Sequence, residues 1–473
     1  MLDAVRTTAD VTLPLTLDRH EDRPLPRQVA DGLRALVADG VLVPGDALPS
    51  TRALAAHLGV ARGTVVAAYE QLTAEGYLRA TTGGATRVDP GAGILHGPLA
   101  APAGRAPTPA VPEALADLRP GRPWLGALAG PGWRRAWRDA AAHPDAAGAQ
   151  GLGLPELREQ LADHLRQMRG MVRSPEHIVV TAGAREGLAL LLTALHLPRR
   201  VGVEVPGYPS LRRVPERLGA EVVGLRVDGL GLVTDALPTT EVPSVVLVTP
   251  SHQHPLGGSL PVGRRRALLA WARTHGVWVV EDDYDSELRY TSEPLPALAA
   301  LDDPHDGRVV TLGTFATTLA PGVGVGFLVA PEPLLPQLEA ARADLGQPVS
   351  AVTQRAIAGH LASGELRRHT QRMRALYRRR RRWVAEALSG LPGVRVAPMH
   401  GGLHAVVQTD RPEAEVLADA AASGVLVTGL SSYWAGAEPD ASGIVLGFGA
   451  ATDAQLAGGL AVLADACSGR VSR

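Results

Sequence analysis

The sequence contains no lysine. All 47 basic residues of this 473-residue chain are arginines. Lysine is the side chain whose primary amine forms a Schiff base with a carbonyl cofactor, so no side chain of this protein can form that bond. Replacement of lysine by arginine is typical of a GC-rich genome, but the chemical consequence is the same whatever its origin.

Cysteine and long apolar runs are also scarce. The single cysteine, Cys467, excludes an intrachain disulfide and a cysteine-based metal cluster, which fits a reducing cytoplasm. No apolar run approaches the roughly 20 residues that a membrane-spanning helix needs. The N-terminal stretch MLDAVRTTADVTLPL lacks the basic start and apolar core of a signal peptide. We therefore expect a cytoplasmic protein without a metal site or membrane contact.

A stretch rich in Pro, Gly and Ala divides the chain into two parts. Residues 89–112 show little periodicity and are typical of a linker. They separate an N-terminal unit, residues 1–88, from a C-terminal unit, residues 113–473. The chain is 45% hydrophobic and 20% charged with a net charge of −1, which is an ordinary globular composition and indicates no particular partner.

The N-terminal unit has the pattern of a helix-turn-helix. STRALAAHLG predicts a short helix that Ser50 or Thr51 caps and Gly59 ends. ARGTVVAAYEQLTAEG (61–76) predicts a second helix after a tight turn, and YLRATTGGATRV (77–88) predicts a β-hairpin, or wing. We therefore expect a winged helix-turn-helix whose second helix enters the major groove of DNA.

Residue types that contact DNA occur at the expected places in this unit. Side chains at helix starts meet bases and phosphates together with the free amides there, and glycines at the wing tip let the backbone approach DNA closely. The expected DNA-contacting residues are Ser50, Thr51, Arg52, Arg62, Gly63, Thr64, Gly83, Gly84 and Thr86.

The charge of this unit is not basic, which bears on how it would bind. Residues 1–90 hold nine Arg against eleven Asp and Glu, so we expect few phosphate contacts per copy and a dimer on two half-sites. The alternative is a small helical domain that binds another protein.

The C-terminal unit alternates short Val-rich runs with helical patterns. The runs are HIVVTAG, RVGVEVPGY, SVVLVTP, VWVVEDDYD and VVTLGTF, in that order. Val-rich strands buried on both faces, with helical crossovers, predict an α/β fold with a mainly parallel sheet. From about residue 350 the pattern is rich in helix, with a strand pair near 394–408, which predicts a smaller α+β lobe.

Both units resemble a known family. PGDALPSTRALAAHLGVARGTV and TTGGATRV resemble the winged helix of the GntR family of bacterial transcription regulators. VVTAGAREGL, VEVPGYPSLR, VTPSHQHPLGG, VVEDDYDSELRY and GTFATTLAPGVGVGF resemble, in order, the motifs of fold-type I aminotransferases in the form found in the MocR subfamily. The resemblance implies a fold that binds pyridoxal 5′-phosphate (PLP), with two subunits building each site.

The resemblance also implies roles for five residues of this PLP site. Asp282 matches the carboxylate that holds the pyridine nitrogen, Tyr284 the phenol that bonds the ring oxygen, and Tyr208 the aromatic residue that stacks on the ring. Ala184 and Arg185 match the phosphate cradle at a helix N-terminus.

Four other positions depart from the family's pattern. Thr317 stands at the lysine position and Gly324 at a phosphate-binding arginine. Gly148 replaces a phosphate-binding tyrosine, and Val445 replaces the arginine that holds a substrate carboxylate. We therefore expect a DNA-binding regulator without catalytic residues or covalently bound cofactor, whose aminotransferase-like unit dimerises and holds a small-molecule effector.

Three alternatives differ in what the C-terminal unit does. It could bind PLP or a PLP adduct noncovalently, or it could only dimerise and sense nothing. It could also be a working PLP-dependent aminotransferase, which the absence of lysine disfavours. The expected partners are a double-stranded DNA operator and a second copy of the chain.

Overall fold

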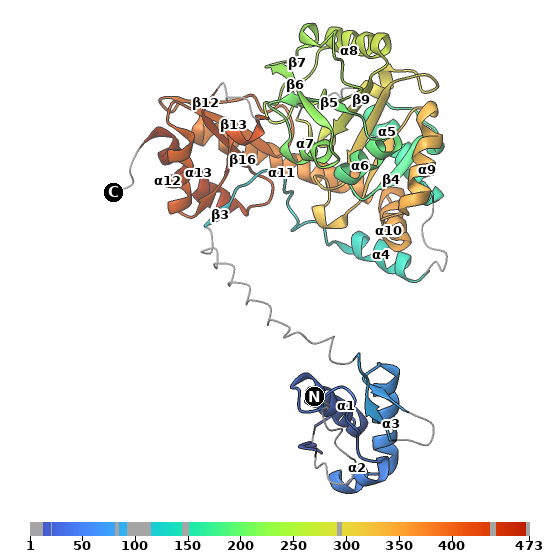
Figure 1. The fold of residues 1–473 in the computed structure, drawn as a ribbon. Helices are drawn as coiled ribbons and strands as arrows, with labels where there is room; N and C mark the ends of the chain where they lie inside the picture. Colours follow the sequence, from blue (N-terminus) through green and yellow to red (C-terminus); the bar gives the residue numbers. More distant parts are fainter. Residues whose placement is uncertain are drawn as a thin grey trace. The chain divides into compact units, whose positions relative to one another are not determined.

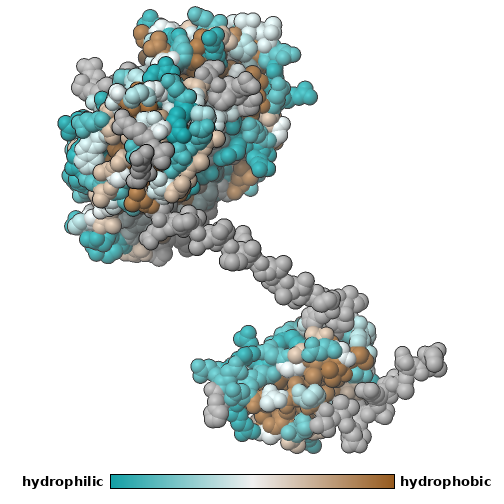
Figure 2. Space-filling view, turned by 90° about the vertical axis from the view of Figure 1, so that its left-hand side faces the viewer, coloured by the Kyte–Doolittle hydropathy of each residue, from teal (hydrophilic) through white to brown (hydrophobic). Residues whose placement is uncertain are grey.

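The computed structural model describes residues 13–19, 21–80, 85–91, 115–143, 151–290, 296–435 and 441–469. The chain divides into two compact units, Met1–Ala110 and Val111–Arg473 (Figure 1). In the described part of the chain, no helix has the length and apolar character that crossing a membrane requires. On the face shown in Figure 2, apolar residues gather over part of the smaller unit, whereas the larger unit is mainly polar there.

The smaller unit is a winged helix-turn-helix. Its elements are α1 (Leu25–Ala38), α2 (Thr51–Leu58), α3 (Arg62–Ala74), β1 (Leu78–Arg79) and β2 (Arg87–Val88). The Ser50 hydroxyl caps α2 by accepting from the Ala53 amide at 3.2 Å, and Gly59 ends this helix in a left-handed conformation. The two strands pair antiparallel as the wing, and Leu33, Leu54, Val65 and Leu72 lie in one buried core.

The larger unit is built on an eight-stranded sheet. Its strands run in the order β4-β11-β10-β9-β8-β5-β6-β7. All are parallel except β11, which is antiparallel to both of its neighbours, and β7, which turns back on β6. Their bounds are β4 (Ile178–Thr181), β5 (Arg200–Val205), β6 (Glu221–Asp228), β7 (Gly231–Leu232), β8 (Val245–Val248), β9 (Trp278–Asp283), β10 (Val309–Thr314) and β11 (Gly326–Val329).

Helices cover both faces of this sheet, because its central strands are apolar on both sides. One face packs against α6 (Ala184–Ala194), α7 (Pro209–Arg217) and α9 (Leu335–Leu345). The other packs against α5 (Pro155–Arg169), α8 (Val262–His275) and α10 (Ala351–Ala362), and α4 (Pro131–Ala141) lies on α10. The predicted winged helix-turn-helix and mainly parallel α/β architecture are thus confirmed.

A second hydrophobic core is formed mainly by the later part of the chain, together with the segment around β3. A four-stranded sheet, β12-β13-β16-β15, packs with α11, α12 and α13, and β3 pairs with β14 beside it. The bounds are β3 (Ala116–Asp117), α11 (Glu365–Leu388), β12 (Val394–Val396), β13 (His404–Thr409), α12 (Glu413–Ala422), β14 (Val425–Leu426), β15 (Thr428–Gly429), β16 (Gly443–Gly447) and α13 (Asp453–Ser468). Short 3₁₀ turns complete the unit: η1 (Pro175–His177), η2 (Thr234–Ala236), η3 (Ser286–Leu288), η4 (Leu298–Leu301), η5 (Pro321–Val323), η6 (Glu332–Leu334) and η7 (Leu430–Tyr433).

Candidate ligand pocket and nucleic-acid interface

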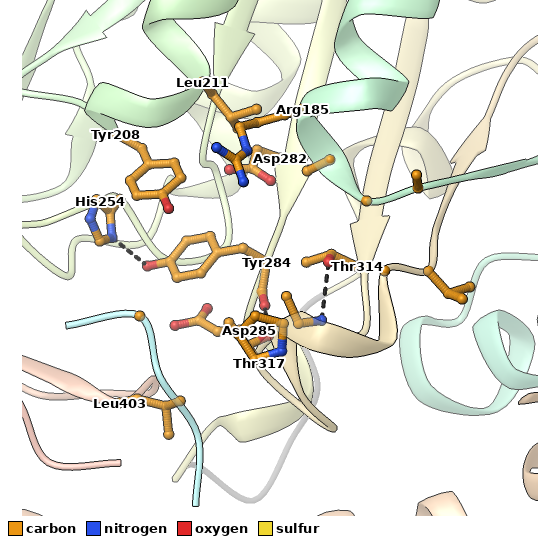
Figure 3. Close-up of a pocket in the computed structure, with 18 of the residues that line it drawn as sticks. Arg185, Tyr208, Leu211, His254, Asp282, Tyr284, Asp285, Thr314, Thr317 and Leu403 are labelled. Atoms are coloured by element: carbon orange, nitrogen blue, oxygen red, sulfur yellow. Dashed lines mark hydrogen bonds between the residues drawn. The ribbon is translucent and has the colours of Figure 1, made fainter. Parts of the chain in front are cut away.

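A cavity of about 230 Å³ lies at the carboxyl ends of the parallel strands. This edge is where open α/β sheets hold ligands, because the loops that follow the strands converge there. All five residues expected in a PLP site lie in its lining: Ala184, Arg185, Tyr208, Asp282 and Tyr284. They come from the segments after β4 and β5 and from the end of β9 with the residue that follows it (Figure 3).

Asp282 is a buried carboxyl that forms no ion pair with any residue the structure describes. Its side chain is 4% exposed, and Oδ1 makes no hydrogen bond with any described residue. Burial, followed by the charges of Asp283 and Asp285, holds the pKa of Asp282 well above its usual range. Burial therefore favours the protonated carboxyl, and a cation or a charged N–H donor that reached it would favour the ionised form.

Tyr284 lies at the centre of a polar cluster. Its hydroxyl is 2.9 Å from His252 Nδ1 and 3.4 Å from His254 Nδ1. His252 Nδ1 also donates to Asp285 Oδ2 at 2.7 Å. Burial, followed by the charges of Asp285 and Asp282, raises the pKa of the Tyr284 phenol well above its ordinary value, so the phenol remains protonated.

Sequence reasoning gave no role to three residues that the fold brings to this cavity. His254, Asp285 and His404 all line it, and His404 reaches it from β13 of the second core. The imidazole rings of His254 and His404 lie 4.8 Å apart between centroids. Burial, then the neighbouring His404 and His252, holds the pKa of His254 well below its usual value, so this ring is neutral. In the sequence, His254 and His404 occur in SHQH and GGLH. Neither motif indicates that these two histidines lie close together in the fold.

The start of α6 forms the side of the cavity suited to an anion. Gly183 precedes the helix with φ 105° and ψ 176°, a conformation that is essentially restricted to glycine. The Arg185 side chain points into the cavity on the side of Asp282 (Figure 3). Helix N-terminal amides and a guanidinium together favour a phosphate or carboxylate.

Thr317 and Gly324 also line the cavity. The Thr317 hydroxyl donates to the Tyr284 carbonyl, so its only polar atom is occupied by the backbone. Gly324 follows η5 with φ 60°, in the left-handed region. A side chain placed at Gly324 alone would therefore be strained.

Of the other two departures from the family's pattern, Val445 does not lie in this lining. Val445 is fully buried in β16 in one apolar cluster with Val406, Leu430 and Tyr433. The expectation that Val445 belongs to the same pocket is therefore corrected, because its side chain is enclosed by apolar neighbours. Gly148 lies outside the described residues.

The expected DNA-contacting residues of α2 and α3 gather at the starts of these helices. Arg62 Nε donates to Thr51 Oγ1 at 3.3 Å, and both Arg52 and Arg62 are exposed. No side chain caps α3, and a Cβ built at Gly63 meets no atom within 4 Å, so the helix start is open to a ligand. Ser50 and Thr64 lie at the same helix starts.

Thr86 lies at the base of the wing, where its carbonyl accepts from the Leu48 amide at 2.8 Å. Gly83 and Gly84, expected at the wing tip, lie outside the described residues. Among the residues that the structure describes, no group of three or more His, Cys, Asp or Glu is arranged to hold a metal ion.

Comparison with known proteins adds to this geometry. Residues 25–88 match the family of bacterial regulatory proteins called gntR, and residues 128–439 match aminotransferase class I and II. The HTH-type pyridoxine biosynthesis transcriptional regulator PdxR of Corynebacterium glutamicum is 48% identical over 96% of this chain and 99% of its own length. The chain belongs to the transcriptional regulators that join a GntR-type helix-turn-helix to an aminotransferase-like domain.

Other members and solved structures agree with this family. The probable rhizopine catabolism regulatory protein MocR of Rhizobium meliloti is 35% identical to this regulator over 78% of each chain. An archaeal alanine:glyoxylate aminotransferase has the same fold, with a TM-score of 0.70 over 75% of this chain and 91% of its own, at 23% identity. GntR helix-turn-helix regulators bind DNA, whereas at that identity the enzyme supports the fold alone.

Proposed function

We propose that this protein is a DNA-binding regulator whose aminotransferase-like domain binds a pyridoxine-type effector without a covalent bond and does not transaminate. The observation that carries the proposal is the cavity itself. It keeps Asp282, Tyr284 and Arg185 in its lining, while the chain offers no lysine amine. The relative named for pyridoxine biosynthesis supports the effector class.

The residues present fit such a ring compound. Asp282 Oδ1 is a buried acceptor without a partner, which the N–H of a protonated pyridine would satisfy. Tyr208 offers an aromatic face at the cavity, and Arg185 with the α6 amides would hold a phosphate. The bound group would supply a charged aromatic ring and an anion, and it would form no covalent bond with the chain.

Gly324 makes the expected affinity modest. A hydrogen bond to a charged group is worth about 1.5–3 kcal/mol, and about 1.4 kcal/mol is a tenfold change in affinity. One missing phosphate contact therefore weakens binding by about ten- to a hundredfold. Reversible occupancy of this kind suits a sensor.

We also propose that the protein binds its DNA operator as a homodimer. Four arginines of the smaller unit are held within it. Arg23 and Arg34 pair with acidic residues, Arg19 donates to the Gly59 carbonyl, and Arg87 donates to the Gly45 carbonyl. Five of the nine arginines of residues 1–90 remain for phosphates, and two copies on two half-sites would double the number of contacts.

Calorimetric titration with pyridoxamine 5′-phosphate and with PLP tests the ligand. We expect reversible binding, no product when PLP and amino acids are mixed with the protein, and a loss of affinity of about tenfold or more in Asp282→Asn or Arg185→Ala. The matched control is Arg213→Ala, an exposed arginine of α7 outside the cavity lining, which should leave affinity unchanged. Absence of binding by the wild type, or transamination above the rate of PLP alone, would contradict the proposal.

A further inference from the structure

A second buried carboxyl lies beside Asp282 at the same edge of the sheet. Glu204, near the end of β5, is 5% exposed. Glu204 and Asp282 both border a void of about 20 Å³, together with Tyr208, Leu211 and Arg212. Asp282 also lines the ligand cavity, so this residue borders both the cavity and the void.

Neutral groups hold Glu204 in place. Its Oε2 accepts from the Thr249 amide at 3.2 Å, from the Thr249 hydroxyl, and from Gln253 Nε2 at 3.4 Å. On the β6 side, the apolar Leu225 is its partner in the sheet. The one arginine at the void, Arg212, has its Nε 3.6 Å from Glu216 Oε1.

Without a counter-charge, burial raises the pKa of Glu204 to about 7. Glu204 in turn raises the pKa of Asp282, after burial itself and the charges of Asp283 and Asp285. Two buried carboxyls that border the same small void resist being ionised together. The other charged or titratable groups around the pair are Arg185, His254, Tyr284 and Asp285 in the cavity lining, Tyr208 and Arg212 at the void, and Glu281 and Asp283 beside Asp282 in β9. Three donors reach Glu204 Oε2 and favour its ionised form, whereas Asp282 Oδ1 accepts no hydrogen bond from a described residue. In the ligand-free cavity, the pair therefore favours its proton on Asp282 and its negative charge on Glu204.

We propose that Glu204 is a positioning residue that takes the proton of Asp282 when a ligand with a protonated ring nitrogen enters the cavity. The inference rests on the proposed function, because it requires a ligand of that class. The O–H bond at Asp282 breaks and an O–H bond forms at Glu204. The ring nitrogen keeps its own proton, and the pair neither gains nor loses one.

This transfer keeps a single negative charge in the buried pair and places it against the charged ring. If Glu204 could not accept the proton of Asp282, that proton would be released to the solvent. The number of protons released on binding therefore reports the role of Glu204, and a merely structural role would not change that number.

The test is calorimetric titration with pyridoxamine 5′-phosphate in buffers of different ionisation enthalpy, for the wild type and Glu204→Gln. At about pH 8, we expect the variant to release about one more proton per site than the wild type. At about pH 6, Glu204 is already protonated because its pKa is about 7, so the difference should vanish. The control Glu221→Gln, an exposed residue of β6, should match the wild type at both values.

Equal proton numbers for the wild type and the Gln variant at both pH values would overturn the inference while leaving the proposed function intact. No binding by the wild type would contradict both. An infrared difference spectrum of the wild type needs no variant: on binding at about pH 8, one protonated carboxyl band should be lost and another gained. Loss without gain would also overturn the inference.

Discussion

At the scale of single residues, Thr317 is the position that separates this cavity from a catalytic one. It lines the cavity, it is half-buried, and its hydroxyl is bonded to the Tyr284 carbonyl. Zero lysines in the chain make the position unusually easy to test, since any amine introduced there is the only side-chain amine present.

We expect Thr317→Lys to create a borohydride-reducible bond with PLP, because the new amine would enter the cavity beside the ring. Mass spectrometry after reduction should find the adduct on residue 317. Thr234→Lys places the only lysine on half-buried η2, outside the cavity, and should give none. If the variant binds PLP reversibly but forms no adduct at residue 317, Thr317 does not occupy the family's lysine position.

At the scale of elements, helix caps link local sequence to the stability of each unit. Ser50 caps α2 and Ser350 caps α10, each accepting from the amide three residues ahead. The two helices belong to different units with separate cores. Loss of either cap should therefore lower the stability of one unit only.

Replacing an N-cap serine by alanine costs about 0.5–2 kcal/mol. We expect Ser50→Ala to lower the unfolding free energy of the smaller unit by about that amount, and Ser350→Ala to lower that of the larger unit. Denaturant unfolding followed by tryptophan fluorescence reports the larger unit, because all seven tryptophans lie beyond residue 110. Circular dichroism reports both. A fall in the stability of the larger unit caused by Ser50→Ala would show that the units do not unfold separately.

At the scale of the whole molecule, the number of copies on the operator sets how DNA binding responds to salt. The logarithm of affinity falls with the logarithm of salt concentration by about 0.9 for each phosphate contact. Arg62 is exposed at the start of α3, whereas Arg34 is tied to Glu75 and Asp31. Of these two arginines, we expect only Arg62 to contact a phosphate.

We expect Arg62→Ala to reduce that slope by about two on a duplex selected for tight binding, because a homodimer loses one contact per copy. Arg34→Ala, checked for folding, should leave the slope unchanged. A reduction of about one would indicate that a single copy binds. Fluorescence anisotropy over a range of salt concentrations gives both slopes.

Local patterns predicted most of the fold. The capping serine, the left-handed Gly59 and the hairpin of the wing follow from short-range chemistry, and Val-rich runs with helical crossovers indicate the parallel sheet. The antiparallel β11, inserted between β4 and β10, did not follow, because strand order depends on contacts between distant segments.

The sequence by itself determined that no side-chain amine exists, and its resemblance to a known family pointed to Asp282, Tyr284, Tyr208 and Arg185 as the residues to expect at a ring-binding site. Only the tertiary structure decided which groups surround them. It brought His404 from β13 and Glu204 from β5 to the neighbourhood of Asp282, and it enclosed Val445 away from the cavity. The reason is physical: residue type is local, whereas burial and charge coupling depend on which distant strands end at the same edge of the sheet.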